Sequence, residues 1–330
     1  MTSQGVTTVL AEAARTGGWA PSVHNTQPWR WRVHPRQLDL YADRSRQLAA
    51  ADPDGRLLTL SCGAALHHAR LALAAAGWQA RVERLPDPNN PDHLARLHPG
   101  DRVDPSAETV RRFQAMDRRR TDRRPVVGGP VPPETLEEIR AAVEAEGAHL
   151  HLLRTEQVSE LAVAARRAHE QSTHDPALRE ELAYWISGPH PPGTGLVAAA
   201  IPREPSHATV PVRDFGGPGD LPVGERAAGG DRGASYVLLF GPQDTPVAWL
   251  HSGEALSAAW LAATARSVAV LPFSAVVELP ATRAVLWRLL AGLGHPYLVL
   301  RLSSDDPEHP APRTPRLDPD EIIEFVDGAR

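Results

Sequence analysis

The stretch that decides the fold is residues 20–29, Ala-Pro-Ser-Val-His-Asn-Thr-Gln-Pro-Trp. It follows Thr7–Arg15, where apolar residues recur at helical spacing before a pair of glycines that can end a helix. The segments Trp29–Val33 and Gln37–Tyr41 come next and alternate between apolar and polar residues, which predicts a β-hairpin. The stretch therefore connects a helix to a sheet and carries two short polar side chains, Ser22 and Asn25.

A second motif lies nearly a hundred residues later, at residues 118–124, with the sequence Arg-Arg-Arg-Thr-Asp-Arg-Arg. The chain contains no lysine, so any phosphate bound by side-chain charge must be bound by arginine, whose planar guanidinium suits phosphate. The absence of lysine also excludes Walker-type phosphate loops and Schiff-base enzymes. The motif predicts a phosphate anchor, although a solvated or nucleic-acid-facing basic patch would have the same composition.

The composition sets broad limits on the protein. A chain of 330 residues with 42% apolar content can bury a large core, as one domain or as two fused ones. The net charge of −5 is mild and gives no general attraction to nucleic acid or membrane. The start carries no signal-peptide pattern and no apolar run is long enough to span a bilayer, so we expect a cytoplasmic protein. The single cysteine excludes an internal disulfide, and the 15 histidines lack metal-ligand spacing.

One helical pattern occurs twice. The first copy spans Ser61–Gly77, with Ser61 as the expected cap, and its Gly-x-Ala-Leu and Leu-Ala pairs recur 190 residues later at 253–256 and 261–262. We expect a strand after each copy, ending in Val82–Pro86 and Val276–Pro280 respectively. A repeat at a fixed offset predicts duplication of a folding unit. The alternative is that two helices in an alanine-rich chain resemble each other through composition alone.

The two motifs resemble those of the nitroreductase family, which marks its flavin-ring segment with Pro-Ser-x-x-Asn-x-Gln-Pro-Trp and its phosphate anchor with Arg-Arg-Ser/Thr-x-Arg. Their order is reversed here, which resembles the Acg-like branch, a fused chain that acts as its own dimer. The resemblance implies an α+β fold with antiparallel sheets flanked by helices. It divides the chain into a first half at 1–112 and a second half at 113–330, with a Gly/Pro-rich lid at about 186–235.

The resemblance also implies one FMN per chain, at the interface between the halves, because residues 147–150 replace the Pro-Ser-x-x-Asn string in the second half. The segment Leu271–Ser274 is where the family turns its backbone past the flavin, but an acidic-Gly pair typical of the family is missing there. We expect His24 to face solvent. The predicted cofactor-binding residues are Pro21, Ser22, Asn25, Gln27, Arg119, Arg120, Thr121, Arg123, Pro272, Phe273, Ser274, Arg313 and Arg316.

The expected function is that of an FMN-dependent oxidoreductase that passes hydride from NAD(P)H, or another reductant, through FMN to a nitroaromatic, quinone or conjugated acceptor. Because the flavin carries the chemistry, no catalytic acid or base is required from the protein. A lid with aromatic cover from Trp185, Phe215 or Tyr236 would instead suit a protein that sequesters FMN without turnover. A third possibility is a flavin-free protein whose basic patch binds nucleic acid. The sequence leaves the acceptor and any further oligomerisation open.

Overall fold

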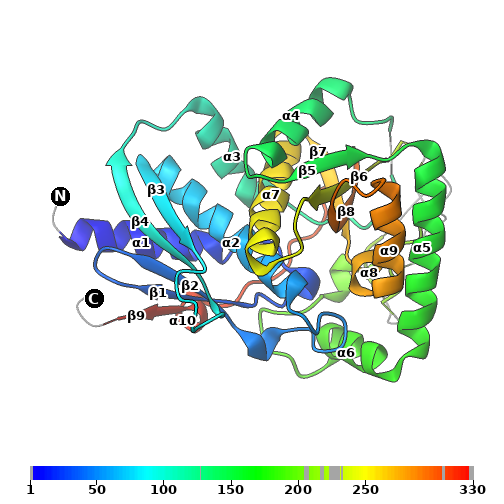
Figure 1. The fold of residues 1–330 in the computed structure, drawn as a ribbon, viewed down its shortest axis with the longest axis horizontal. Helices are drawn as coiled ribbons and strands as arrows, with labels where there is room; N and C mark the ends of the chain where they lie inside the picture. The colour runs from blue at the N-terminus through cyan, green and yellow to red at the C-terminus, as the bar shows by residue number, and fades with distance from the viewer. Residues whose placement is uncertain are drawn as a thin grey trace.

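The computed structural model describes residues 3–126, 128–203, 208–215, 219–222, 231, 233–306 and 309–326. The fold is α+β, with two sheets that are mostly antiparallel and helices packed against both of them (Figure 1). Among the described residues, no helix is long and apolar enough to cross a membrane.

The first sheet has the strand order β3-β4-β2-β1-β9. Strands β1 and β2 pair antiparallel with Trp29 opposite Ala42, so the predicted hairpin is confirmed. Strand β9 comes from the C-terminal segment and pairs parallel with β1, so both ends of the chain meet at this sheet. The elements of this part are α1 (Ser3–Gly17), β1 (Trp29–Val33), β2 (Leu38–Ala42), α2 (Arg56–Ala75), β3 (Trp78–Arg84), β4 (His93–Arg102), α10 (Pro319–Ile322) and β9 (Ile323–Phe325).

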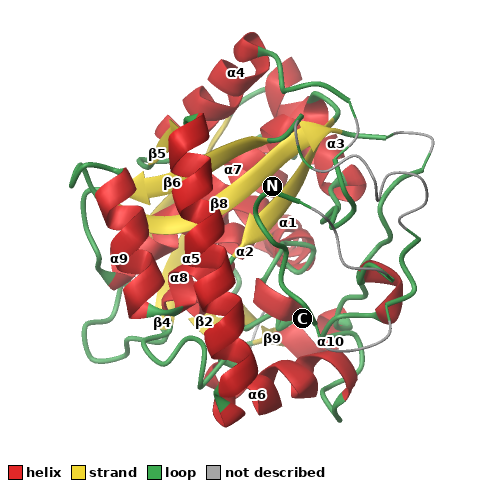
Figure 2. Ribbon diagram, turned by 90° about the vertical axis from the view of Figure 1, so that its right-hand side faces the viewer, coloured by secondary structure: helices red, strands yellow, loops and turns green. Residues whose placement is uncertain are grey.

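The second sheet has the strand order β5-β6-β8-β7. Helix α7 covers one of its faces, and α8 and α9 lie on the other, with the long helix α5 beside them (Figure 2). The elements of this part are α3 (Ala107–Arg118), α4 (Pro133–Glu144), β5 (His149–Leu152), α5 (Thr155–His174), α6 (Pro176–Ser187), β6 (Ser235–Gly241), α7 (Pro246–Ala265), β7 (Val268–Phe273), α8 (Ala275–Glu278), α9 (Pro280–Leu289) and β8 (His295–Ser304).

The two sheets repeat one topology. If β1, β2, β3 and β4 are matched to β5, β6, β7 and β8, both sheets have the same strand order, apart from the added β9. Helices α2 and α7 begin at residues 56 and 246, which are 190 positions apart, and both contain 20 residues. Strands β3 and β7 begin at residues 78 and 268 and keep the same offset. The sequence repeat therefore coincides with equivalent elements of the two sheets.

Two separate hydrophobic cores lie under the two sheets, and α2 and α7 pack against each other between them (Figure 1). The first core is built around the fully buried Trp29 and Trp31, which alternate along β1 with exposed arginines. The second contains Trp260 from α7 and the apolar residues of β6 and β8. The α2–α7 pair therefore marks the boundary between the two sheets and their cores. A site built from residues of both would lie along this boundary.

Two local predictions were wrong. Helix α2 begins at Arg56, so Ser61 lies inside it and donates its hydroxyl to the carbonyl of Leu57 at 2.7 Å. The carboxylate of Asp52 instead accepts a hydrogen bond from the amide of Leu58 at 2.8 Å and caps the first turn. Residues 276–280 contain no strand: residues 275–278 form the short helix α8, and the strand that follows α7 is β7.

Candidate functional site

A cavity of about 340 Å³ lies between the two parts of the chain, within the range of about 300 to 1,000 Å³ typical of small-molecule sites. Residues of both sequence motifs line it, together with side chains from α2, α5, α6 and α7. The structure therefore brings together two segments that are nearly a hundred residues apart. The predicted site residues that line the cavity are Pro21, Ser22, Asn25, Arg119, Thr121, Arg123, Pro272, Phe273, Ser274 and Arg316.

The loop that carries the first motif has an unusual backbone. The φ angles of His24, Asn25 and Gln27 are 50°, 57° and 51°. They lie in the left-handed region, which residues other than glycine seldom adopt. Such conformations cost free energy and persist where surrounding contacts impose them, commonly at functional sites. The Ser22 hydroxyl accepts a hydrogen bond from the amide of Gln27 at 2.9 Å and holds the turn closed.

Asn25 ties this loop to the C-terminal segment. Its side-chain amide donates to the carbonyl of Pro315 at 3.1 Å, and its Oδ1 accepts from Arg316 at 3.1 Å. Because Asn25 is 5% exposed, these bonds are shielded from water. The loop geometry at the cavity thus depends on residues nearly three hundred positions away in the sequence.

Arg119 and Arg316 supply concentrated positive charge to the cavity wall. The Nε atoms of both are buried, and neither has a hydrogen-bond partner among the described residues. Among the described residues, neither guanidinium forms an ion pair with a carboxylate. The guanidinium carbon of Arg119 lies 4.8 Å from the centroid of the Trp260 ring. Burial, and to a lesser extent the charge of Arg120, lowers the pKa of Arg316 to about 10. Burial also lowers the pKa of Arg119, and the charges of Arg316 and Arg120 act in the same direction. Two cations whose charges act on each other, each with a buried and unpartnered Nε, favour a bound anion.

Arg123 and Thr121 extend this positive wall. Arg123 is 9% exposed, donates to the carbonyl of Ala200 at 3.2 Å and lies over the ring of Phe215 at 5.4 Å. Burial lowers its pKa to about 10. Thr121 forms an isolated parallel bridge with Val270 of β7, which places the arginine motif alongside the strand whose end lines the cavity.

Three predicted site residues do not line the cavity. Gln27 is fully buried and holds the loops together, donating to the carbonyl of Gly193 at 2.7 Å and accepting from the amide of Leu317 at 3.0 Å. Arg120 donates to the carbonyl of Asp117 at 2.6 Å. Arg313 has a 65% exposed side chain that pairs with Asp117 at 2.9 Å. Their contacts support the segments that carry the cavity residues.

Other expectations near the cavity had mixed outcomes. His24 is half-buried and lines the cavity, so the expectation that it faces solvent was wrong; burial and the nearby Arg213 and Arg123 lower its pKa. Phe215 lines the cavity, whereas Trp185 and Tyr236 are buried elsewhere. Parts of the predicted lid, residues 204–207, 216–218, 223–230 and 232, lie outside the described residues. The described residues 211–215 line the cavity.

The sequence reasoning missed the wall contributed by helices. Ala165, His169, Ser172 and Thr173 of α5 line the cavity at spacings of four, seven and eight residues, which place them on one helix face. That periodicity was readable from the sequence, but nothing in it distinguishes a cavity wall from a core face. Leu60, Ser61, Leu256 and Trp260 of the two central helices were missed for the same reason.

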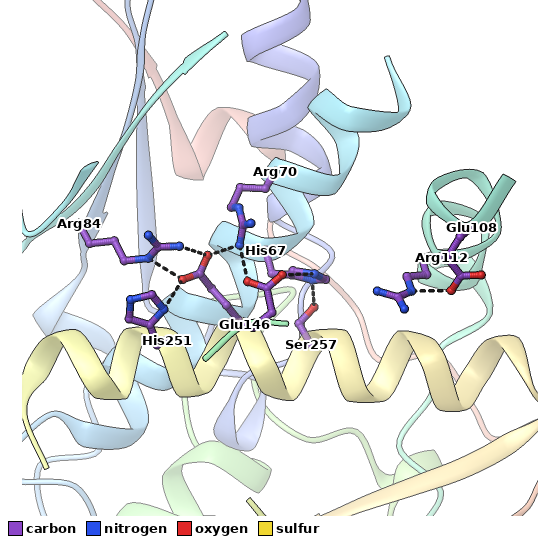
Figure 3. Close-up of polar contacts among 9 residues, drawn as sticks. His67, Arg70, Arg84, Glu108, Arg112, Glu146, His251 and Ser257 are labelled. Carbon is purple, nitrogen blue, oxygen red and sulfur yellow. Dashed lines mark hydrogen bonds and ion pairs between the residues drawn. The ribbon is translucent and has the colours of Figure 1, made fainter. Parts of the chain in front are cut away.

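The position equivalent to the cavity in the other part of the chain holds a charged cluster (Figure 3). An offset of 190 relates Trp260, Ser274 and Ser61 of the cavity wall to Arg70, Arg84 and His251.

Glu254, which is fully buried, joins these residues. It accepts from Arg70 at 2.6 Å and from Arg84 at 2.7 Å, and Arg70 also pairs with Glu146 at 2.6 Å (Figure 3). His67 lies next to them and bonds Ser257 at 2.8 Å (Figure 3). No group able to hold a metal ion is found among the described residues.

Comparisons with known proteins identify relatives along most of the chain. No family model matches the chain. The Mycobacterium tuberculosis (strain H37Rv) protein provisionally named NAD(P)H nitroreductase Rv3131 is 39% identical over 326 residues, covering 97% of this chain and 91% of the relative. The protein provisionally named NAD(P)H nitroreductase acg from the same strain is 33% identical over 327 residues, covering 96% of both chains.

The fold is α+β with a cavity lined by both parts of the chain, and the sequence relatives define the family. The chain belongs to the nitroreductase superfamily, in its Acg-like branch. Among solved structures, the FMN- and NADPH-dependent nitroreductase NfnB from Sphigopyxis sp. strain HMH aligns with a TM-score of 0.42 and 18% identity, over 65% of this chain and 98% of that one. The assignment rests on the sequence relatives alone.

Proposed function

We propose that this protein is an FMN-dependent oxidoreductase of the nitroreductase type that reduces a nitroaromatic, quinone or conjugated acceptor. The observation that carries the proposal is the pair of guanidiniums of Arg119 and Arg316 in the wall of a ligand-sized cavity. Each has a buried Nε with no hydrogen-bond partner in the described part of the chain. A phosphate dianion would accept hydrogen bonds from these N–H groups and would balance their positive charge.

The residues present fit FMN. Arg119, Arg123, Arg316 and the Thr121 hydroxyl would hold its phosphate, since they line one side of the cavity. The loop at residues 21–25 and the end of β7 at residues 272–274 would hold its ring and ribityl chain. When bound, FMN supplies the two-electron redox chemistry. The chain itself binds, orients and shields the reacting groups.

The reductant is proposed from the relatives. Two of them are provisionally named NAD(P)H nitroreductases, and they align along more than nine tenths of this chain. A nicotinamide donor for this protein follows as the simplest assignment. His24 and Phe215 contact each other edge to face at 6.5 Å at the cavity wall and would border the path that a donor takes.

We also propose that the chain is an internal pseudo-dimer with halves at 1–112 and 113–330, arising by duplication, and that it binds one FMN. The shared strand order and the constant offset of 190 support duplication. The ion pairs of Arg70, Arg84, Glu146 and Glu254 occupy the position equivalent to the cavity, which supports a single site. Cytoplasmic location stays a prediction.

A second candidate function, FMN sequestration without turnover, is favoured by one observation. The segment at residues 211–215 is fastened over the cavity by an ion pair of Arg213 with Glu278 and by the stacking of Arg123 on Phe215. A cover fastened in this way would restrict access of a donor to the flavin.

Rapid mixing with NADPH or NADH under anaerobic conditions separates the two functions. We expect the flavin absorbance to bleach at a rate fast enough to support turnover, and subsequent addition of a quinone to restore it. Bleaching by dithionite alone, with no response to either nicotinamide, would contradict the oxidoreductase proposal and support sequestration. The variant Arg213→Ala, which releases the cover, serves as a control because it should speed reduction if access is limiting.

A further inference from the structure

A second cavity, of about 300 Å³, lies at the N-terminal ends of α2 and α7. Its remaining walls come from the loop at residues 50–54, from α5 and α6, from α8 and α9, and from the start of β8. Leu60 is the one described residue that lines both cavities, and none of the residues proposed to hold FMN lines the second. Its volume falls at the lower end of the range of about 300 to 1,000 Å³ for small-molecule sites.

The two cavities have opposite charge. The described wall of the first contains one carboxylate, and its guanidiniums are Arg119, Arg123, Arg179, Arg213 and Arg316. The wall of the second contains two guanidiniums, Arg56 and Arg283, and its carboxylates are Asp52, Asp54, Asp175, Asp244 and Glu278. A local excess of negative charge attracts cations and repels anions. The second cavity therefore does not suit the phosphate-bearing ligand proposed for the first.

Glu278 is the carboxylate that lacks part of its expected bonding. Its side chain is 2% exposed, and one oxygen pairs with Arg213. The other, Oε1, is buried and has no hydrogen-bond partner among the described residues. A buried carboxylate oxygen without a donor costs free energy that a ligand N–H would recover. By contrast, Asp175 and Asp244 are bonded, to the amide of Ala177 at 2.9 Å and to Arg56 at 2.7 Å.

Asp52 adds a second buried carboxylate to the same wall and is 5% exposed. Burial raises its pKa to about 6, and the charge of Glu278 contributes in the same direction. Asp52 accepts a hydrogen bond from the amide of Leu58 at 2.8 Å, and the charges of the two carboxylates repel each other. A cation bound between them would be attracted to both, which reverses that repulsion.

Apart from Gln171 and Ser252, the uncharged part of the wall is apolar or aromatic. Leu57, Leu60 and Pro280 line it together with Trp249 and Tyr297. The polar atoms of both aromatic side chains are already bonded, Trp249 to Asp244 at 2.7 Å and Tyr297 to the carbonyl of Gln243 at 2.6 Å. Their rings remain as apolar surface. We propose that this cavity is a second ligand site, which binds a small organic ammonium compound with an apolar body and its charged head at Glu278 and Asp52.

Isothermal titration of the full-length, FMN-supplemented protein with three isosteric probes tests this proposal. Benzylammonium carries the predicted charge, benzyl alcohol is neutral and benzoate is an anion. We expect benzylammonium to bind with an affinity at least about tenfold above that of the other two, equivalent to about 1.4 kcal/mol. Benzoate binding as tightly as benzylammonium, or no binding of benzylammonium, would overturn the proposal.

Two variants locate the binding. Glu278→Gln removes one carboxylate and should weaken benzylammonium binding about tenfold, whereas Glu137→Gln on the exposed face of α4 should leave it unchanged. Ala177→Trp adds bulk at an exposed position of the cavity wall and should abolish binding by filling the cavity. It provides a second test in case Glu278→Gln destabilises the fold. Unchanged binding in folded Ala177→Trp would place the probe elsewhere and overturn the proposal. The result is independent of whether the first cavity binds FMN.

Discussion

Gly63 and Gly253 meet where α2 crosses α7, and each occupies the same place in its own helix. A Cβ on Gly63 would lie 2.9 Å from the Cα of Gly253, and a Cβ on Gly253 would lie 2.8 Å from the Cα of Gly63. Each would also overlap a carbonyl oxygen of the opposite helix, that of Leu250 and that of Leu60 respectively. Since 60 and 63 differ from 250 and 253 by 190, this contact has the reciprocal form of a two-fold symmetric interface.

This crossing predicts that Gly253→Ala destabilises the protein. The added methyl group meets backbone atoms, which cannot move aside as a flexible side chain would, so we expect a loss of about 3 kcal/mol in the free energy of unfolding, at the upper end of overpacking effects. Urea denaturation measures it. Gly129→Ala is the control, because a Cβ there meets nothing within 4 Å. Equal stability of the two variants would contradict close packing of α2 against α7.

The charged cluster at the equivalent position predicts a large effect of Glu254→Gln. Glu254 is fully buried between Arg70 and Arg84, so the substitution leaves two cations without their shared carboxylate. Breaking a buried pair of this kind costs about 3 to 5 kcal/mol. Chemical denaturation is again the measurement.

The matched control for Glu254→Gln is Glu138→Gln, which breaks a half-exposed pair with Arg266. Exposed pairs contribute about 0 to 1 kcal/mol. If both variants lost the same small amount, the cluster would not be a buried network, and the argument for a filled second position would lose its support.

We predict that His67 makes the folded protein less stable at acidic pH. Burial lowers its pKa to about 3, whereas in the unfolded chain it titrates near its ordinary value of 6.5. Between these values the unfolded state binds the extra proton, so the stability that neutral His67 contributes is complete above pH 6.5 and is lost as the pH falls toward 3.

We expect His67→Gln to reduce the slope of stability against pH in that window by about 1.4 kcal/mol per pH unit, the value for one proton. Denaturation series at intervals between pH 6.5 and 4 measure the slope, and a series at pH 8, where the histidine is neutral in both states, gives the offset due to lost packing. An unchanged slope would mean that His67 is charged in the folded protein.

The hairpin of Trp29–Val33 and Gln37–Tyr41 could be predicted because alternation of apolar and polar residues is a local signal. The fold class followed from the family resemblance of the two motifs, and the offset of 190 followed from a pattern that recurs along the chain. It misplaced the start of α2 because the cap comes from Asp52, a residue outside the periodic run. It missed β9 because three residues are too few to show alternation. The match of Val276–Pro280 to Val82–Pro86 suggested a strand, but residues 275–278 form a single helical turn.

For the site, ten predicted residues line one cavity. Six of them belong to the two motifs, which have distinctive residue types, and Pro272, Phe273, Ser274 and Arg316 were predicted from the family resemblance. Gln27, Arg120 and Arg313 have those same residue types but lie outside the cavity, and only the tertiary contacts reveal this. His24 shows the reverse case: its left-handed backbone turns it toward the cavity, and no sequence pattern reports such a conformation.

The flavin content of the purified protein tests the central claim most directly. The measurement is the visible absorption spectrum, with the released chromophore identified, for the unaltered chain, an Arg119→Ala, Arg123→Ala double variant and Arg313→Ala as the control that lies outside the cavity. We predict close to one FMN per chain in the unaltered protein and the control, and none in the double variant. A folded, colourless protein that takes up no added FMN, or a double variant that keeps its flavin, would contradict this account.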